Sequence, residues 1–158
     1  MSASKSSSYE ILTLESNDQQ RTVDIRTGTV SVDYYEDIFS PTITAKIKVA
    51  NTGTSIAPKD NPDGPKQSIY HGLPLRGGER LRMKILDRGE GKLGLDFATD
   101  PSKYLFVSSI TDVVSETQRE SFTLNLVSRE AITNETTRVI KKYNTCLLYT
   151  SPSPRDSA

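Results

Sequence analysis

The chain has one histidine and one cysteine, so sites that need several imidazole or thiol groups are excluded. A zinc site at His71 would require three carboxylates beside it, and this is an unusual set of ligands for zinc. Cys146 has no second cysteine with which to form an internal disulfide. We therefore expect His71 to be a loop residue without a chemical role, and we predict no metal and no cofactor.

Residues 89–94, GEGKLG, match the GxGxxG pattern of dinucleotide-binding loops. In such a loop the glycines follow a buried strand and open a helix whose N-terminus holds the pyrophosphate. The residues that follow here, Leu93 to Phe97, alternate between apolar and polar as a strand does. The pattern therefore predicts a glycine-rich hairpin rather than a phosphate-binding loop.

The acidic candidates are Asp60, Asp63 and Asp87 as calcium ligands, and Glu36 with Asp37 or Asp24 with Asp33 as carboxylate pairs. The segment around Asp60 lacks the long acidic loop that calcium sites use, and its prolines and glycine favour a turn. No spacing on a sheet identifies a carboxylate pair for glycoside chemistry. No serine lies in a nucleophile elbow. We therefore predict that the protein is not an enzyme.

Five basic residues are the positive feature that remains. Lys46 and Lys48 alternate with apolar residues on one predicted strand, and Arg80, Arg82 and Lys84 do so on another. Both rows should point away from the core. They are either solvated faces that discourage edge-to-edge aggregation, or a charged inner wall or inter-subunit surface whose charges help to fix the register of an assembly.

Composition limits the remaining classes of function. The chain has 158 residues, the size of one domain, with 20 basic and 20 acidic side chains and a net charge of zero. This balance argues against binding to nucleic acid or to an anionic membrane through bulk charge. No apolar run approaches the roughly 20 residues that cross a bilayer. Residues 1–8 are rich in serine and lack an apolar core, so we expect a flexible start rather than a signal peptide, in a protein kept in the cytoplasm.

Alternating apolar residues predict a mainly β protein, an antiparallel barrel or sandwich of about seven strands. The predicted strands cover residues 9–14, 23–34, 43–49, 81–85, 93–97, 104–114 and 122–126. Within the second, Gly28 indicates a bulge or a bend in one long strand. Residues 54–66 predict a loop because they are rich in proline, aspartate and glycine, and residues 116–119 predict a polar hairpin tip.

After Val127 the apolar period becomes that of a helix. The residues on one helical stripe are Ile132, Val139, Ile140 and Tyr143. We therefore predict a C-terminal helix near residues 128–143, with Ser128 as its N-cap. Basic residues at 138, 141 and 142 suit the C-terminal end of the helix dipole. Asn134 allows either one helix or two short ones.

The last residues do not resemble part of a fold. Residues 146–156, CLLYTSPSPRD, match one reading frame of a transposase adapter used in sequencing libraries. We interpret residues 146–158 as the translation of that adapter and leave them out of the fold. The expected domain is then residues 9–145, and we expect the natural protein to continue beyond Thr145.

Three segments carry a resemblance to a known family. The longest is SSITD at 108–112 with QRESFTLNLVSREAITNE at 118–135, and the others are SPTIT at 40–44 and GLPLRGGE at 72–79. They resemble the baseplate hub proteins of contractile-tailed bacteriophages, especially T-even-like phages that infect cyanobacteria. The similarity covers most of residues 9–143. These are patterns of fold and interface, and none is a catalytic motif.

The resemblance implies a tail-tube-like β-barrel followed by a helix. In this family two such barrels per chain let a trimer present a pseudo-sixfold ring to the hexameric tail tube. The trimer also seats the central spike, and the ring lines the channel through which DNA passes. We accordingly expect a virion protein of the tail baseplate, assembled in the host bacterial cytoplasm. Its expected partners are itself, the tail tube and the spike, with no membrane and no specific binding of DNA.

A neutral ring wall lets DNA slide, because few phosphates are neutralised. We therefore predict that most of the five basic residues face neighbouring subunits or pair with carboxylates. The alternatives are a tail tube or tube-adaptor protein of the same fold, and a β-type ligand-binding module. Such a module would need an exposed aromatic platform, for which Tyr34 with Tyr35 is the only candidate, since the chain has no tryptophan.

Overall fold

The computed structural model describes residues 7–51, 56, 63, 65–73, 75–87, 94–116 and 120–138. Within these residues the chain has eight strands and two short α-helices. The strands are β1 (Ser8–Glu15), β2 (Thr22–Asp24), β3 (Thr29–Tyr35), β4 (Thr44–Asn51), β5 (Arg80–Leu86), β6 (Gly94–Phe97), β7 (Leu105–Ser115) and β8 (Glu120–Val127). The helices are α1 (Ile69–Gly72) and α2 (Arg129–Thr136), with 3-10 turns η1 (Arg26–Gly28) and η2 (Pro101–Lys103). Neither described helix is long and apolar enough to cross a membrane.

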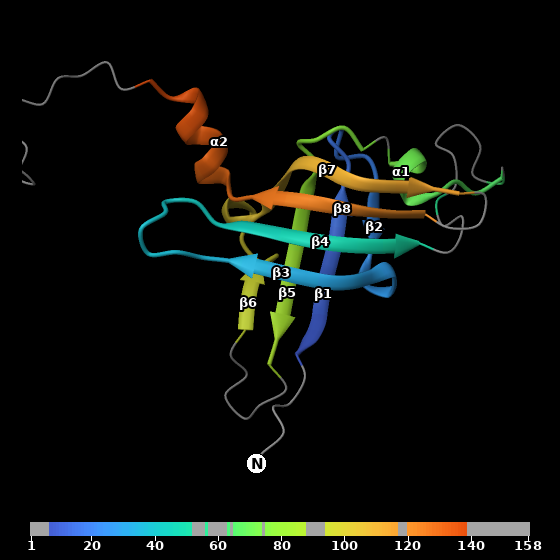
Figure 1. Ribbon diagram of the computed structural model, residues 1–158, viewed down its shortest axis with the longest axis horizontal. Helices are drawn as coiled ribbons and strands as arrows, with labels where there is room; N and C mark the ends of the chain where they lie inside the picture. Colours follow the sequence, from blue (N-terminus) through green and yellow to red (C-terminus); the bar gives the residue numbers. More distant parts are fainter. Residues whose placement is uncertain are drawn as a thin grey trace, which may run out of the picture.

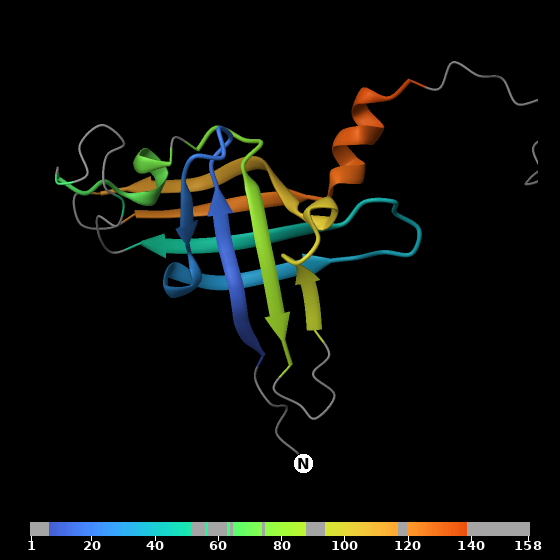
Figure 2. The ribbon, with the colours of Figure 1, turned by 180° about the vertical axis from the view of Figure 1, so that it is seen from behind.

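The strands form one antiparallel sheet that folds over on itself as a half-barrel (Figure 1). Its order is β2-β1-β5-β7-β8-β4-β3, and β6 pairs with the end of β5. Only two residue pairs join β5 to β7, Arg80 with Phe106 and Leu81 with Leu105. The sheet turns its corner there, so β1, β5 and β6 cross β3, β4, β7 and β8 at a steep angle in both views (Figures 1 and 2). The predicted fold class is confirmed: a mainly β, antiparallel sheet followed by a helix.

Residues 22–35 form two strands, so the prediction of one long strand bent at Gly28 is wrong. β2 pairs with β1 at one edge of the sheet, whereas β3 pairs with β4 at the other edge. The turn η1 joins them and thereby connects the two edges of the half-barrel. A Cβ atom on Gly28 would lie 3.1 Å from the carbonyl oxygen of Ala50, so glycine allows the turn to pass close to β4.

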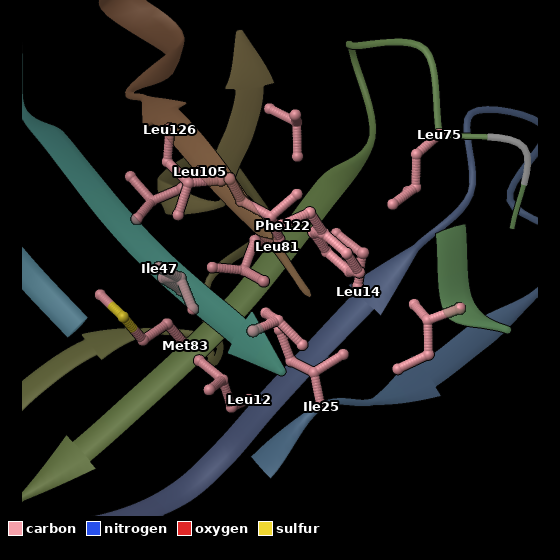
Figure 3. Packing of buried hydrophobic residues seen from close by; sticks show 14 of the residues in the cluster. Leu12, Leu14, Ile25, Ile47, Leu75, Leu81, Met83, Leu105, Phe122 and Leu126 are labelled. Atoms are coloured by element: carbon pink, nitrogen blue, oxygen red, sulfur yellow. The ribbon is translucent and has the colours of Figure 1, made fainter. Parts of the chain in front are cut away.

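The core lies between the two arms of the folded sheet (Figure 3). Alternate strand residues point into it, as the apolar pattern predicts. The buried strand residues are Leu12, Leu14, Ala45, Ile47, Val49, Leu81, Met83, Leu105, Val107, Phe122, Leu124 and Leu126. Each large side chain of this kind stabilises the fold by about 1.5–3 kcal/mol when fully buried. Ile69 and Leu73, at the two ends of α1, complete one side of the core.

α1 is a one-turn helix at a place where the sequence predicts a loop around His71. Ser68 is its N-cap: the Ser68 hydroxyl accepts the N–H of His71 at 3.4 Å and donates to the carboxylate of Glu120 at 2.8 Å. Burial of Ile69 holds the turn against the core. His71 itself is exposed and contacts the ring of Tyr70 edge-on, with 5.4 Å between ring centroids. The turn depends on contacts with β8, which local sequence patterns do not report.

Two glycines before β5 form a turn, and a buried carboxylate holds it. Gly77 and Gly78 have φ angles of 101° and 91°, which side chains with a Cβ rarely adopt. The carboxylate of Glu79, 1% exposed, accepts the N–H of Arg76 at 2.7 Å and that of Gly77 at 2.9 Å. It also accepts the side-chain amide of Asn17 at 3.2 Å. These donors offset the cost of burying the charge.

α2 begins where the sequence predicts and ends earlier. Ser128 is the N-cap position, but its hydroxyl accepts the N–H of Ile43 at 3.2 Å instead of a helix N–H. Asn134 lies inside a single helix, which ends at Thr136. Arg138 follows that end, so its predicted place in the last turn is wrong. The rest of the predicted helix, and the adapter segment, lie outside the described residues. α2 buries none of its residues and projects from the sheet (Figure 1).

Candidate interaction surface

The five basic residues lie on the outer sides of two different arms of the sheet. Lys46 and Lys48 alternate with the buried residues of β4 and are exposed. Arg80, Arg82 and Lys84 alternate with the buried residues of β5 and are half-buried. The folding of the sheet thus separates the two rows, and they do not form one continuous basic patch.

Lys84 is the member of the five with carboxylate partners. Its ammonium nitrogen lies 3.0 Å from the carboxylate of Glu10 and 3.9 Å from that of Asp96. The hydrogen bond to Glu10 is the main reason that the pKa of Lys84 is raised. Among the described residues Lys46, Lys48, Arg80 and Arg82 make no ion pair, so the predicted contact of most basic residues with neighbouring subunits stays a prediction.

Asp96 belongs to a local turn as well as to the Lys84 pair. Its carboxylate accepts the Thr99 hydroxyl at 2.7 Å and the N–H groups of Ala98 and Thr99 at 3.0 and 2.9 Å. These hydrogen bonds, with that of the Thr99 hydroxyl first, lower the pKa of Asp96 to about 2, and Lys84 contributes less. The carboxylate therefore stabilises the chain between β6 and η2 and is not free for chemistry.

The two arginines of β5 each lie beside an aromatic residue. The guanidinium carbon of Arg82 lies 5.7 Å from the ring centroid of Tyr104, within the range of a cation–π contact. The Nε atom of Arg82 is buried and has no hydrogen-bond partner among the described residues. Arg80 stands beside Phe106 across the β5–β7 corner. This part of the outer face therefore combines positive charge with aromatic surface.

The structure does not bring the candidate carboxylate pairs together. Asp24 on β2 is bound by the side chain of Arg26, whose hydrogen bonds lower its pKa, and Asp33 on β3 is in register with Lys46. Glu36 accepts the hydroxyl of Tyr34 at 2.8 Å, and Asp37 accepts the N–H of Phe39 at 2.9 Å. Three of the four carboxylates, those of Asp24, Glu36 and Asp37, therefore have a local hydrogen-bond partner, which gives no support to a two-carboxylate site.

The other candidates also remain separate. The described residues contain no group of three or more histidine, cysteine or carboxylate side chains that could hold a metal. Asp63 and Asp87 are described and exposed, whereas Asp60 lies outside the described residues. So does most of the GxGxxG segment, and its last residue, Gly94, begins β6 rather than a helix. A strand at this point agrees with the predicted hairpin.

Tyr34 and Tyr35 do not present a common aromatic platform. Tyr34 is partly buried, packs against Phe97 with 5.8 Å between ring centroids, and has its pKa raised to about 12, first by burial and then by Glu36. Tyr35 is 52% exposed. Successive residues of a strand point to opposite faces, so the two rings cannot form one flat surface.

The loop from β3 to β4 carries an apolar feature that the sequence analysis did not single out. Ile38 and Phe39 are each 93% exposed, more than any other large apolar residues described. The loop extends beyond the sheet at the end where α2 projects (Figures 1 and 2). Two adjacent apolar residues between strands, preceded by Glu36 and Asp37, are the sequence signal that identifies it.

A groove lies at the same end, between α2 and the outer face of the sheet. It encloses about 440 Å³. The lining residues are Arg80, Pro101, Tyr104, Phe106, Arg129, Ile132, Thr133 and Thr136. Ile132 is 40% exposed there, and two guanidinium groups, from Arg80 and Arg129, stand at the same groove. The arrangement offers positive charge beside apolar and aromatic side chains, which suits contact with a protein segment.

No family model, curated protein or solved structure matches the chain.

Proposed function

We propose that this protein is a structural assembly subunit of a phage tail baseplate hub, part of a ring that joins the tail tube to the central spike. The observation that carries the proposal is the exposure of Ile38 and Phe39 at the tip of the β3–β4 loop. Full burial of a side chain of this size contributes about 1.5–3 kcal/mol, and this loop leaves both in water. Burial of this exposed apolar pair against another protein would recover that free energy.

Two of the segments that resemble the hub family reach the end of the molecule that carries the β3–β4 loop and α2 (Figure 1). Residues 40–44 lead from the exposed loop into β4, and residues 118–135 include β8 and most of α2. The third segment, residues 72–79, ends in the turn that Glu79 holds before β5. The resembling segments therefore include the elements that carry the loop and the groove, which favours an interface function for them.

The charge distribution agrees with a channel through which DNA passes without binding. The chain has a net charge of zero, and Lys84 is neutralised by Glu10 and Asp96. Retention of DNA grows with each phosphate that a protein neutralises. A ring of such subunits would present few unpaired cations to DNA, provided that Lys46 and Lys48 face neighbouring subunits, as we propose.

Electron microscopy of the protein expressed from its complete gene tests the proposal. A ring with threefold symmetry, a pseudo-sixfold outline and a central opening is the expected result. A ring of six identical subunits would instead indicate a tail tube or tube-adaptor protein. A protein that stays monomeric at high concentration and binds no tail component would overturn the assembly function itself.

A further inference from the structure

The β3–β4 loop presents two carboxylates followed by two apolar side chains. Glu36 and Asp37 are exposed, and their hydrogen bonds in the described chain come from the Tyr34 hydroxyl and from the N–H of Phe39. Ile38 and Phe39 are 93% exposed. The loop therefore presents two carboxylates and two apolar side chains to solvent in the single chain.

The groove beside α2 has the complementary chemistry. Arg80 and Arg129 line it and make no ion pair among the described residues. Phe106 and Ile132 provide apolar surface between them, and the whole groove encloses about 440 Å³. An acidic and apolar segment fits both properties, because carboxylates pair with guanidinium groups while the apolar side chains lose contact with water.

We propose that the β3–β4 loop of one copy of this chain docks into the α2 groove of the next copy. Glu36 and Asp37 pair with Arg80 and Arg129, and Ile38 and Phe39 lie against the apolar part of the groove. The inference rests on the proposed assembly function and names the partner of that same surface. Each copy carries both the acidic and apolar loop and the basic and apolar groove.

The contact joins different copies, because within one chain Ile38 and Phe39 are 93% exposed and therefore do not lie in the groove. Pro41, at the root of the loop, lines a neighbouring hollow with Glu130 and Asn134, and Arg129 and Thr133 line both this hollow and the groove.

Such a contact is heterologous, since each copy offers its loop to one neighbour and its groove to another. Heterologous contacts generate closed rings when the rotation between copies closes, and filaments when it does not. A loop-to-groove contact therefore supplies the repeated interface that a ring requires.

Charge reversal on each side tests the contact in the 158-residue chain by sedimentation velocity over a concentration series. The loop variant carries Glu36→Arg and Asp37→Arg, and the groove variant carries Arg80→Glu and Arg129→Glu. Each variant alone should associate at least about tenfold more weakly than the unchanged chain, because loop and groove then carry the same charge. An equimolar mixture should regain association, since every loop can then find a groove of opposite charge.

A control with two charge reversals carries Lys66→Glu and Glu116→Arg, two exposed residues outside both surfaces, and should associate as the unchanged chain does. Circular dichroism checks that each variant is folded. The loop variant alters only exposed residues, so it tests the loop side of the contact even where the groove variant is unstable. Variants that associate as strongly as the unchanged chain would overturn the loop contact but leave the assembly function standing. An unchanged chain that stays monomeric would also overturn the loop contact, and electron microscopy with the complete gene product then decides the assembly function separately.

Discussion

Ser128 and Ile43 exchange two hydrogen bonds across the sheet. The N–H of Ser128 donates to the carbonyl of Ile43 at 2.9 Å, and the N–H of Ile43 donates to the Ser128 hydroxyl at 3.2 Å. Ile43 ends the β3–β4 loop and Ser128 begins α2, so this pair ties together the two elements that form the candidate interaction surface.

Replacing Ser128 by alanine should lower the free energy of unfolding by about 1 kcal/mol, because the partly buried N–H of Ile43 then loses its acceptor. Ser128 is 5% exposed, so water can replace the hydroxyl only in part. Denaturant unfolding measures the effect. Ser109→Ala is the control, since Ser109 is exposed and its hydroxyl makes no hydrogen bond in the described chain, and it should change stability by less than about 0.5 kcal/mol. Equal effects of the two variants would contradict a role for the Ser128 bond.

Replacing Glu79 by alanine should destabilise the fold by about 3 kcal/mol or more. The change leaves the N–H groups of Arg76 and Gly77 and the amide of Asn17 without their acceptor, and each hydrogen bond to a charged group contributes about 1.5–3 kcal/mol. Denaturant unfolding with Glu116→Ala as an exposed control measures the difference. A loss no larger than that of the control would show that the carboxylate does not hold the turn before β5.

The stability of the protein should depend on Asp96 at acidic pH. The pKa of Asp96 is lowered from its ordinary value of 3.8 to about 2 in the folded chain, chiefly by the Thr99 hydroxyl. The ionised carboxylate therefore stabilises the folded state at pH values above 3.8. That contribution is present at neutral pH and is lost as the pH falls from about 4 to about 2. Unfolding of the unchanged chain and of Asp96→Asn should therefore differ at pH 6 and converge toward pH 2. In a Thr99→Val background the difference in stability at pH 6 between the chain that keeps Asp96 and the chain with Asp96→Asn should be smaller. If the stabilities of the unchanged chain and of Asp96→Asn change in parallel with pH, Asp96 is not the group responsible.

Replacing Ile38 and Phe39 by serine should leave the free energy of unfolding within about 0.5 kcal/mol of its original value, because both side chains are 93% exposed. The same change should reduce self-association, since it removes apolar surface from the loop. Unfolding and sedimentation measured on one sample separate the two effects. A large loss of stability would mean that the loop packs against its own chain.

Assembled rings should leave double-stranded DNA free at about 150 mM salt, because few phosphates can be neutralised by a chain with zero net charge. Fluorescence anisotropy of a labelled duplex measures binding. The comparison variant carries Lys46→Glu and Lys48→Glu. Neither this variant nor the unchanged protein should bind the duplex. Tight binding that disappears in this variant would place both lysines in the channel.

The sequence predicted the burial pattern well, because the side chains of a strand alternate between its faces whatever its partners are. Leu12 and Leu14, and Phe122 with Leu124, lie in the core as their spacing indicates. The outward direction of Lys46 follows from the same rule. These properties depend on neighbours within one strand, which the sequence contains directly.

Partners between strands could not be derived in this way. The pattern of residues 22–35 fits one bent strand as well as two, and only pairing with β1 and with β4 places them at opposite edges of the sheet. The pairing of Lys84 with Glu10 likewise joins residues on different strands. The end of α2 at Thr136 shows the same limit, since apolar spacing continues beyond the residue where the helix ends.

By itself, then, the sequence determined that the chain is a mainly β protein, which residues face its core, and that its charges balance. The tertiary structure alone decided that the β3–β4 loop leaves Ile38 and Phe39 in water and that Arg80 and Arg129 share a groove. The reason is physical: alternation is a local property of the chain, whereas exposure and grooves arise where segments distant in sequence meet or fail to meet.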